Sequence, residues 1–348
     1  MSWMEVRLNT TGEAVDWIST LLASVGYRGD LDIAPYAAAS APSEDQAHSE
    51  DQIDQSSDHA NASDATPDSP VLPEWAFTIC LLFPATAQAR SQTNQIMQQL
   101  STLQRTGMIS EPQIEVLEEK PVRNASFANE GHRIGNRFVV FSSDAAPPES
   151  SDDVVLKLEK SLAFGSGLHP ATIACLRLIE RHSVSGMQVL DLGSGSGILS
   201  VAMAKLGAQV LALDNDEVAV KATQSAVLCN GVEQQVTVRA GSLGRGSDLG
   251  HCMGGETVAD VPTIQPIANF DLIVANILAR VHITLAEDFR LALRRTSNHA
   301  GMLITGGFTT DYEEEVHLAL AEAGFESVDC ERINEWVVLA HQLKAVPA

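Results

Sequence analysis

Basic residues are missing from one long stretch of this 348-residue chain, because no Lys or Arg occurs between Arg28 and Arg90. The same stretch carries eleven acidic residues, about half of the net charge of −23. A surface of this sign repels the phosphates of a nucleic acid and attracts a basic macromolecule. We therefore expect a basic protein partner and no direct contact with nucleic acid. The alternative is that the acidity only keeps the protein soluble.

Long apolar runs and paired cysteines are also missing. No run approaches the roughly 20 apolar residues that cross a bilayer, and the first residues lack the apolar segment of a secretory signal. The cysteines are odd in number and never spaced as Cys-x-x-Cys, which argues against a disulfide framework or a zinc ribbon. They are Cys80, Cys175, Cys229, Cys252 and Cys330. These absences predict a soluble cytoplasmic protein with buried free thiols and no membrane contact.

Motifs of metal and hydrolytic sites are absent too: the chain has no HxH, HExxH or GxSxG sequence. We therefore expect neither a catalytic metal nor hydrolysis by an activated nucleophile. Large aliphatic side chains are nearly absent from residues 37–70, where Ile53 is the only one. Such a stretch cannot bury enough apolar surface to offset the entropy of ordering, so we predict a disordered acidic insert.

The rest of the N-terminal third has regular apolar patterns. Strands are predicted at 4–8, 31–33, 75–83 and 113–117, and helices at 13–25 and 87–105. The order βαββαβ predicts a ferredoxin-like α+β domain over residues 1–119, a scaffold that serves many functions. A linker is predicted over 120–151, with one strand at 137–141.

From residue 152 to 348 strands and helices alternate. Strands are predicted at 188–192, 210–214, 236–239, 271–275, 302–305 and 336–341, and helices at 168–182, 197–206, 216–229, 281–295 and 311–323. This alternation predicts an α/β domain with a mostly parallel sheet covered by helices on both faces. A second insert, at 244–266, is expected to loop out.

A glycine-rich turn follows the first of these strands. Asp191 closes an apolar strand and is followed by Gly193, Gly195 and Gly197. Glycines permit a tight turn and let a ligand lie against the backbone. A dinucleotide site would place pyrophosphate here with the spacing GxGxxG. The spacing is instead GxGxG, and the preceding carboxylate would repel phosphate but attract the α-ammonium of a methionine moiety. The turn therefore favours S-adenosylmethionine as cofactor.

A second acid lies at a matching interval. Asp214 comes 21 residues after Gly193 and closes the next apolar strand. An acid at this place can accept hydrogen bonds from both ribose hydroxyls of an adenosine. Asp216 is interpreted as a helix N-cap rather than a ligand.

Asn276 marks the acceptor side, at the end of the fourth predicted strand. Ligands of open α/β sheets bind beyond the carboxyl ends of the strands. The amide oxygen of Asn276, with the next backbone carbonyls, could hold a target amine and aim its lone pair at a methyl group. The alternative is an ordinary loop-forming Asn.

A loop of small residues, 162–172, opens a helix upstream of the glycine turn. Pro170 suits a first helical turn, and Thr172 could offer its hydroxyl to the cofactor. His169 is a candidate general base, although a lone histidine at a helix start is more often a cap or a packing residue.

Four segments together resemble the bacterial PrmA family. They are AFGSGLHPAT, VLDLGSGSGILSVAMAKLGA, FDLIVANIL and AGFESVDCERINEWVVLA, within residues 155–343. The resemblance implies a class I AdoMet-dependent methyltransferase, with a Rossmann-like, mostly parallel seven-stranded sheet. Family members methylate amino groups of the eleventh protein of the large ribosomal subunit. The βαββαβ region is similar to the family's substrate-recognition domain.

Carried over residue by residue, the resemblance places cofactor contacts at Thr172, Gly193, Asp214 and Asn276, with Asn276 also near the acceptor amine. Ser242 falls in a segment similar to the one near the adenine ring. We therefore expect a protein N-methyltransferase acting on lysine or N-terminal amines of a basic ribosomal protein. The alternatives are the same chemistry on another protein or a small amine, and a non-catalytic cofactor-binding module in ribosome assembly.

Overall fold

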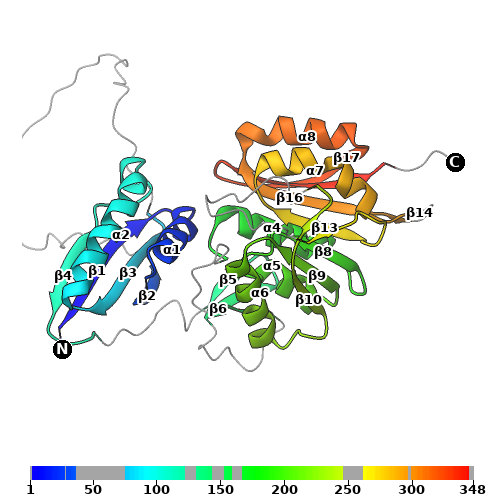
Figure 1. Cartoon of the computed structure of the whole chain (residues 1–348). Helices are drawn as coiled ribbons and strands as arrows, with labels where there is room; N and C mark the ends of the chain where they lie inside the picture. The colour runs from blue at the N-terminus through cyan, green and yellow to red at the C-terminus, as the bar shows by residue number, and fades with distance from the viewer. Residues whose placement is uncertain are drawn as a thin grey trace, which may run out of the picture.

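The computed structural model describes residues 2–27, 29–36, 75–121, 131–142, 153–158, 167–245, 262–296 and 299–344. They build two main sheets, one of four strands toward the N-terminus and one of seven strands toward the C-terminus (Figure 1). The predicted acidic insert at 37–70 lies outside the described residues, as do most of the predicted loop at 244–266 and part of the predicted linker.

The four-stranded sheet is antiparallel and carries two helices. Its elements in chain order are β1 (Trp3–Thr10), α1 (Ala14–Ser24), β2 (Asp30–Pro35), β3 (Phe77–Pro84), α2 (Ala87–Arg105) and β4 (Gln113–Leu117). The strand order is β2-β3-β1-β4, and every neighbouring pair is antiparallel. This is the ferredoxin-like topology, so the prediction from the βαββαβ order is confirmed.

The core of this sheet lies between its central strands and the two helices. Successive side chains of a strand point to opposite faces, so Met4, Val6 and Leu8 of β1 share one face. Met4, Val6 and Leu8 form one cluster with Ile18 of α1 and Ile96 of α2. The face of the sheet that carries the helices is therefore a complete hydrophobic layer.

Three short strands lie between the two main sheets in sequence. They are β5 (His132–Ile134), β6 (Phe138–Ser142) and β7 (Val154–Leu158), and they pair as a small sheet of their own. Ile134, Phe138 and Leu156 are at most 1% exposed and belong to the same core as the helices of the larger sheet. The described part of the predicted linker therefore contributes side chains to a core.

The seven-stranded sheet has the order β10-β9-β8-β13-β16-β18-β17. Its strands are β8 (Gln188–Leu192), β9 (Gln209–Asp214), β10 (Val236–Ala240), β13 (Leu272–Asn276), β16 (Met302–Thr309), β17 (Phe325–Ile333) and β18 (Trp336–Leu343). Only the pairs that include β18 are antiparallel. The mostly parallel seven-stranded sheet implied by the resemblance is confirmed.

β17 is absent from the predicted strands. Most of its residues are exposed or half-buried, because it forms one edge of the sheet. Its polar composition therefore lacks the apolar pattern that marks the inner strands. The other six strands match their predicted positions to within a few residues.

Helices cover both faces of this sheet (Figure 1). They are α4 (Pro170–His182), α5 (Ile198–Lys205), α6 (Glu217–Asn230), α7 (Ala279–Ala292) and α8 (Glu313–Glu322), the last preceded by the 3-10 turn η2 (Thr310–Tyr312). The helices α4, α5 and α6 share one core, whereas α7 and α8 share the other. Smaller pairs are β11 (Ser242–Leu243) with β12 (Thr263–Ile264), and β14 (Arg295–Thr296) with β15 (His299–Ala300).

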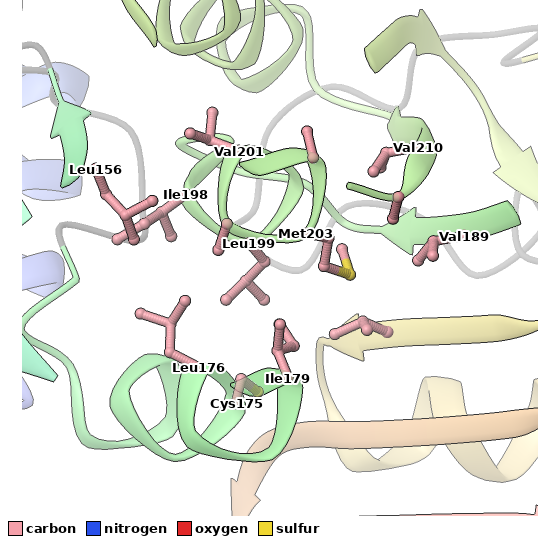
Figure 2. Close-up of a cluster of buried hydrophobic side chains, with 14 of the residues drawn as sticks. Leu156, Cys175, Leu176, Ile179, Val189, Ile198, Leu199, Val201, Met203 and Val210 are labelled. Atoms are coloured by element: carbon pink, nitrogen blue, oxygen red, sulfur yellow. The ribbon is translucent and has the colours of Figure 1, made fainter. Parts of the chain in front are cut away.

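The first of these cores fixes the helix that follows the glycine turn. Figure 2 shows Leu176 and Ile179 of α4 facing Leu199 of α5, with Val189 of β8 beside them. Each of these four side chains is at most 4% exposed. Because close packing leaves little freedom, α5 is held rigidly and so is the turn from which it starts.

The thiols are only partly as predicted. Cys80 and Cys175 are buried, Cys229 is half-buried, and Cys330 is exposed on the edge strand β17, so the prediction of buried thiols is wrong for Cys330. Cys252 lies outside the described residues. Among the helices that the structure describes, none is long and apolar enough to cross a membrane.

Candidate active site

The turn between β8 and α5 needs its glycines. Gly193, Gly195 and Gly197 have φ angles of 77°, 54° and 82°, a region that L side chains rarely adopt. A Cβ on Gly193 would lie 2.4 Å from Ile277 Cγ2, and one on Gly197 would lie 2.9 Å from Thr223 Cα. The turn is therefore pressed between the chain after β13 on one side and α6 on the other.

Asp214, at the end of β9, holds this turn through its carboxylate. Gly195 N donates to Oδ2 at 2.9 Å, and Asp216 N donates to Oδ1 at 3.0 Å. Burial raises the pKa of Asp214, and the backbone donors oppose that shift. A carboxylate has about four acceptor sites, and the backbone N–H groups of Gly195, Asn215 and Asp216 do not fill them all. Asp216 caps α6 by accepting from Val218 N, as predicted.

The segment that carries Ser242 runs next to Asp214. Gly241 N donates to the backbone carbonyl of Asp214 at 2.8 Å. Ser242 itself is 8% exposed and donates its backbone N–H to Pro262 O at 3.0 Å. The structure thus brings the carboxyl ends of β9 and β10 together, where ligands of such sheets bind.

Asp191 is completely buried beneath α5. Ser200 Oγ donates to its Oδ2 at 2.5 Å, whereas Oδ1 has no hydrogen-bond partner among the described residues. Burial, aided by the charge of Asp214, raises the pKa of Asp191 to about 7. Buried acceptors are nearly always satisfied in native proteins. A cationic group of a ligand would satisfy this one and favour its ionised form.

His169 has a structural role. Its Nδ1 accepts a hydrogen bond from Ala171 N at 3.1 Å, which makes it the N-cap of α4. Its ring also packs edge-on against Trp336, with ring centroids 4.4 Å apart. Burial lowers the pKa of His169 to about 4. The interpretation as a cap and packing residue is favoured over that of a general base.

Asn276 ends β13 and contacts the first turn of α4. Its Nδ2 donates to Thr172 Oγ1 at 3.4 Å, and its Oδ1 is buried without a hydrogen-bond partner in the described chain. The next two carbonyls, which we expected to help, are already engaged. Ile277 O accepts from His282 Nε2 at 3.1 Å, and Leu278 O accepts from Val281 N at 2.9 Å. The amide oxygen of Asn276 is thus the one acceptor of these three without a hydrogen-bond partner among the described residues.

The predicted residues therefore form two neighbouring groups. Gly193, Gly195 and Asp214 meet at the glycine turn, while Thr172 and Asn276 meet at the end of β13. Ile277 joins the groups, because its side chain touches Gly193. The part of the motif at 159–166 lies outside the described residues. Among the described residues, no group of three His, Cys, Asp or Glu side chains is arranged to hold a metal ion.

Two contributors were not predicted. The glycine pair Gly306–Gly307 interrupts β16 with a bulge, and His282 bridges it to the end of β13. Two adjacent glycines inside a strand are a signal of a bulge or a close backbone approach. His282 has no comparable signal, since its partner Gly306 is 24 residues away.

Comparison with known proteins decides the family. Residues 2–344 match the family described as "Ribosomal protein L11 methyltransferase (PrmA)". The chain belongs to this family. Curated relatives of that name include one from Chloroflexus aurantiacus, 37% identical, with 98% of each chain covered, and one from Herpetosiphon aurantiacus, 36% identical, covering 98% of this chain and 99% of the relative. A crystal structure of ribosomal protein L11 methylase from Lactobacillus delbrueckii subsp. bulgaricus is 29% identical, with a TM-score of 0.47, and covers 61% of this chain and all of that one.

Membership makes the chain a methyltransferase, and its cofactor is S-adenosylmethionine. The residues present suit that molecule. Asp191 has a buried, unpartnered carboxylate oxygen that suits an ammonium group, and Asp214 has acceptor capacity left for a hydroxyl. At the three glycine positions no Cβ stands in the way of a ligand that lies against the backbone.

Proposed function

We propose that the chain methylates ribosomal protein L11, the protein that the names of its curated relatives give for those proteins, and that it does so on amino groups. The observation that supports the chemistry is the buried, unpartnered Oδ1 of Asn276 beside the glycine turn. A side-chain acceptor in this position is suited to an N–H donor, which is what a neutral amine presents.

The same proposal assigns the cofactor contacts. Asp214 accepts from the ribose hydroxyls, Asp191 attracts the α-ammonium, and Gly193 and Gly195 lie against the methionine moiety. Thr172 contacts the cofactor while it orients Asn276. Ser242 lies near the adenine ring, in the segment that the Gly241–Asp214 hydrogen bond holds beside β9.

The bound cofactor supplies an electrophilic methyl group on a positively charged sulfur. The chain's own task is to position the nucleophile, which provides much of the rate in an in-line displacement. Asn276 Oδ1 accepts an N–H of the amine, so the nitrogen lone pair points away from Asn276. With the methyl group supplied by the bound cofactor, the alkylated nitrogen would be cationic and would lose a proton to return to the neutral form.

The amine must be neutral to attack. Desolvation lowers the pKa of a buried amine, so an apolar surrounding favours the reactive form. Ile277, next to Asn276, is half-buried and packs with the core that includes α7. This placement suits a lysine whose amine reaches Asn276 while its aliphatic stem packs against Ile277.

We further propose that residues 1–119 form the substrate-recognition domain, 120–151 the linker, and 152–348 the methyltransferase domain of a cytoplasmic enzyme. The net charge of −23 supports a basic substrate, whose association should be faster at low ionic strength. The same charge is unfavourable for direct binding of nucleic acid.

The test uses labelled S-adenosylmethionine and large ribosomal subunits from cells without this methylation. We expect label in one small basic protein, at lysine or N-terminal amines. Asn276→Ala should keep cofactor affinity within about threefold while its turnover falls about 100-fold, because it removes a contact to the nucleophile. Label found only in other proteins or in small amines would contradict the substrate. Binding of cofactor without any transfer would indicate a non-catalytic module.

A further inference from the structure

His282 lies in the first turn of α7 and is completely buried. Its Nε2 is 2.8 Å from Gly306 O and 3.1 Å from Ile277 O. The ring also packs near Phe308, with centroids 5.4 Å apart. One imidazole nitrogen is therefore shared between two backbone carbonyls, one in the bulge of β16 and one just after the end of β13.

The contacts determine the state of the ring. Carbonyl oxygens only accept hydrogen bonds, so Nε2 must carry the proton. Nδ1 is buried and has no hydrogen-bond partner within the described ranges, which is consistent with a bare nitrogen. Burial lowers the pKa of His282 to about 4, so the ring stays neutral at physiological pH. His282 is thus a fixed single donor.

The two carbonyls lie on either side of the acceptor residue. Ile277 follows Asn276 directly, and Gly306 pairs with Asn276 in the sheet register. Ile277 N also donates to Gly306 O at 3.0 Å. His282 and Ile277 N therefore converge on the same oxygen, and together they tie the end of β13 to β16.

Space around this junction is tight. Gly307 has φ 86°, and a Cβ on it would lie 2.5 to 2.9 Å from backbone atoms of Ile277. The backbone after Asn276 is pressed onto the bulge of β16 and cannot move toward it. The remaining freedom is to move away, and the hydrogen bonds from His282 oppose that movement.

We propose that His282 is a positioning residue for methyl transfer: its Nε2–H ties Ile277 O to Gly306 O and so holds the Asn276 amide oxygen where the acceptor amine meets it. His282 touches neither substrate nor cofactor. This inference rests on the proposed function of Asn276.

A matched pair of variants tests it. His282→Gln keeps an N–H donor on a flexible side chain, whereas His282→Met has a similar length and volume without a donor. We expect His282→Met to lower kcat about 10- to 100-fold, because a displacement of about 1 Å at the reacting groups has that effect. His282→Gln should restore kcat to within about fivefold of wild type, while both variants keep KM and cofactor affinity within about threefold.

Several results would overturn the inference. One is a kcat of His282→Met within threefold of wild type; another is an equal loss in both variants at equal Tm, which would mean that packing alone matters. If His282→Met does not fold, nitrogen NMR of the wild-type imidazole decides, because a proton on Nδ1 instead of Nε2 refutes the bridge. Asn276→Ala is assayed in parallel: unchanged turnover there would reject the proposed function, whereas a loss there with intact His282→Met would reject only this inference.

Discussion

The two halves of the candidate site are built in different ways. At the glycine turn, the carboxylate of Asp214 is bound by backbone N–H groups, and the special backbone of three glycines is local in sequence. At the end of β13, the amide of Asn276 depends on Thr172, which is 104 residues away, and on a backbone held by His282. The hydrogen bond that holds the first half spans 19 residues of sequence, whereas the one that holds Asn276 spans 104.

The largest effect should come from the first half. Asp214→Ala removes the acceptor for two backbone donors and for the ribose hydroxyls, so cofactor affinity should fall about 100-fold or more. Asp216→Ala is the matched control, since it removes a nearby exposed acid that only caps α6, and it should leave affinity within about threefold. Calorimetry measures both. Equal affinities of the two variants would mean that the halves do not differ as described.

A smaller effect is expected in the second half. Thr172→Val removes the hydroxyl that accepts from Asn276 Nδ2, so kcat should fall about tenfold, the value of one hydrogen bond at the reacting group. Thr172→Ser keeps the hydroxyl and should stay within about threefold of wild type. Steady-state kinetics at saturating cofactor separates the variants. A loss in Thr172→Ser as large as in Thr172→Val would assign the effect to packing of the methyl group.

The titration of Asp191, which lies in the first half, should make the stability of the protein depend on pH. Burial raises the folded pKa of Asp191 to about 7, well above that of a free aspartate, so the native state binds a proton more tightly than the unfolded state. Without cofactor, this stabilisation is present below about pH 4 and is lost as the pH rises through about 7. As the pH rises over this range, the Tm of the wild type should therefore fall by several degrees relative to the Tm of Asp191→Asn, whose side chain does not titrate.

Cofactor binding should show the opposite trend, because the α-ammonium favours the ionised carboxylate. Wild-type affinity should increase between about pH 6 and 8, and Asp191→Asn should lose most of this increase. Titrations at several pH values measure the slope. Equal slopes in both proteins would remove Asp191 from the ammonium site and leave its burial as a feature of the core.

The smallest effect is expected at a contact outside the glycine turn. Trp336 Nε1 donates to Glu13 Oε2 at 2.9 Å, across residues 323 positions apart, and burial raises the pKa of Glu13. Glu13→Ala should lower the free energy of unfolding by about 1 kcal/mol or less, and Glu13→Gln, which keeps an acceptor, by less still. Urea titration measures the difference. A change in cofactor affinity in either variant would be unexpected, because this contact lies outside the glycine turn.

The contrast between local patterns and contacts of residues distant in sequence also explains which elements could be predicted from the sequence. The βαββαβ order, the inner strands of the large sheet and the glycine turn are local patterns, and the structure confirms these elements. β17 was missed because its exposed residues carry no apolar pattern. The end-of-strand position of Asn276 was predictable, whereas the engagement of Ile277 O was not, since His282 reaches it only through the fold of α7. The unpartnered oxygen of Asp191 likewise appears only once Ser200 has taken the other one.

Ile277 lies between the glycine turn and the bulge of β16. Its side chain fills the space where Gly193 would carry a Cβ, and its backbone lies against Gly307. We therefore expect a replacement that enlarges or reshapes this side chain to disturb the glycine turn as well as the neighbourhood of Asn276. Directed evolution toward other amines should leave Ile277 unchanged and vary residues that do not contact the glycine turn.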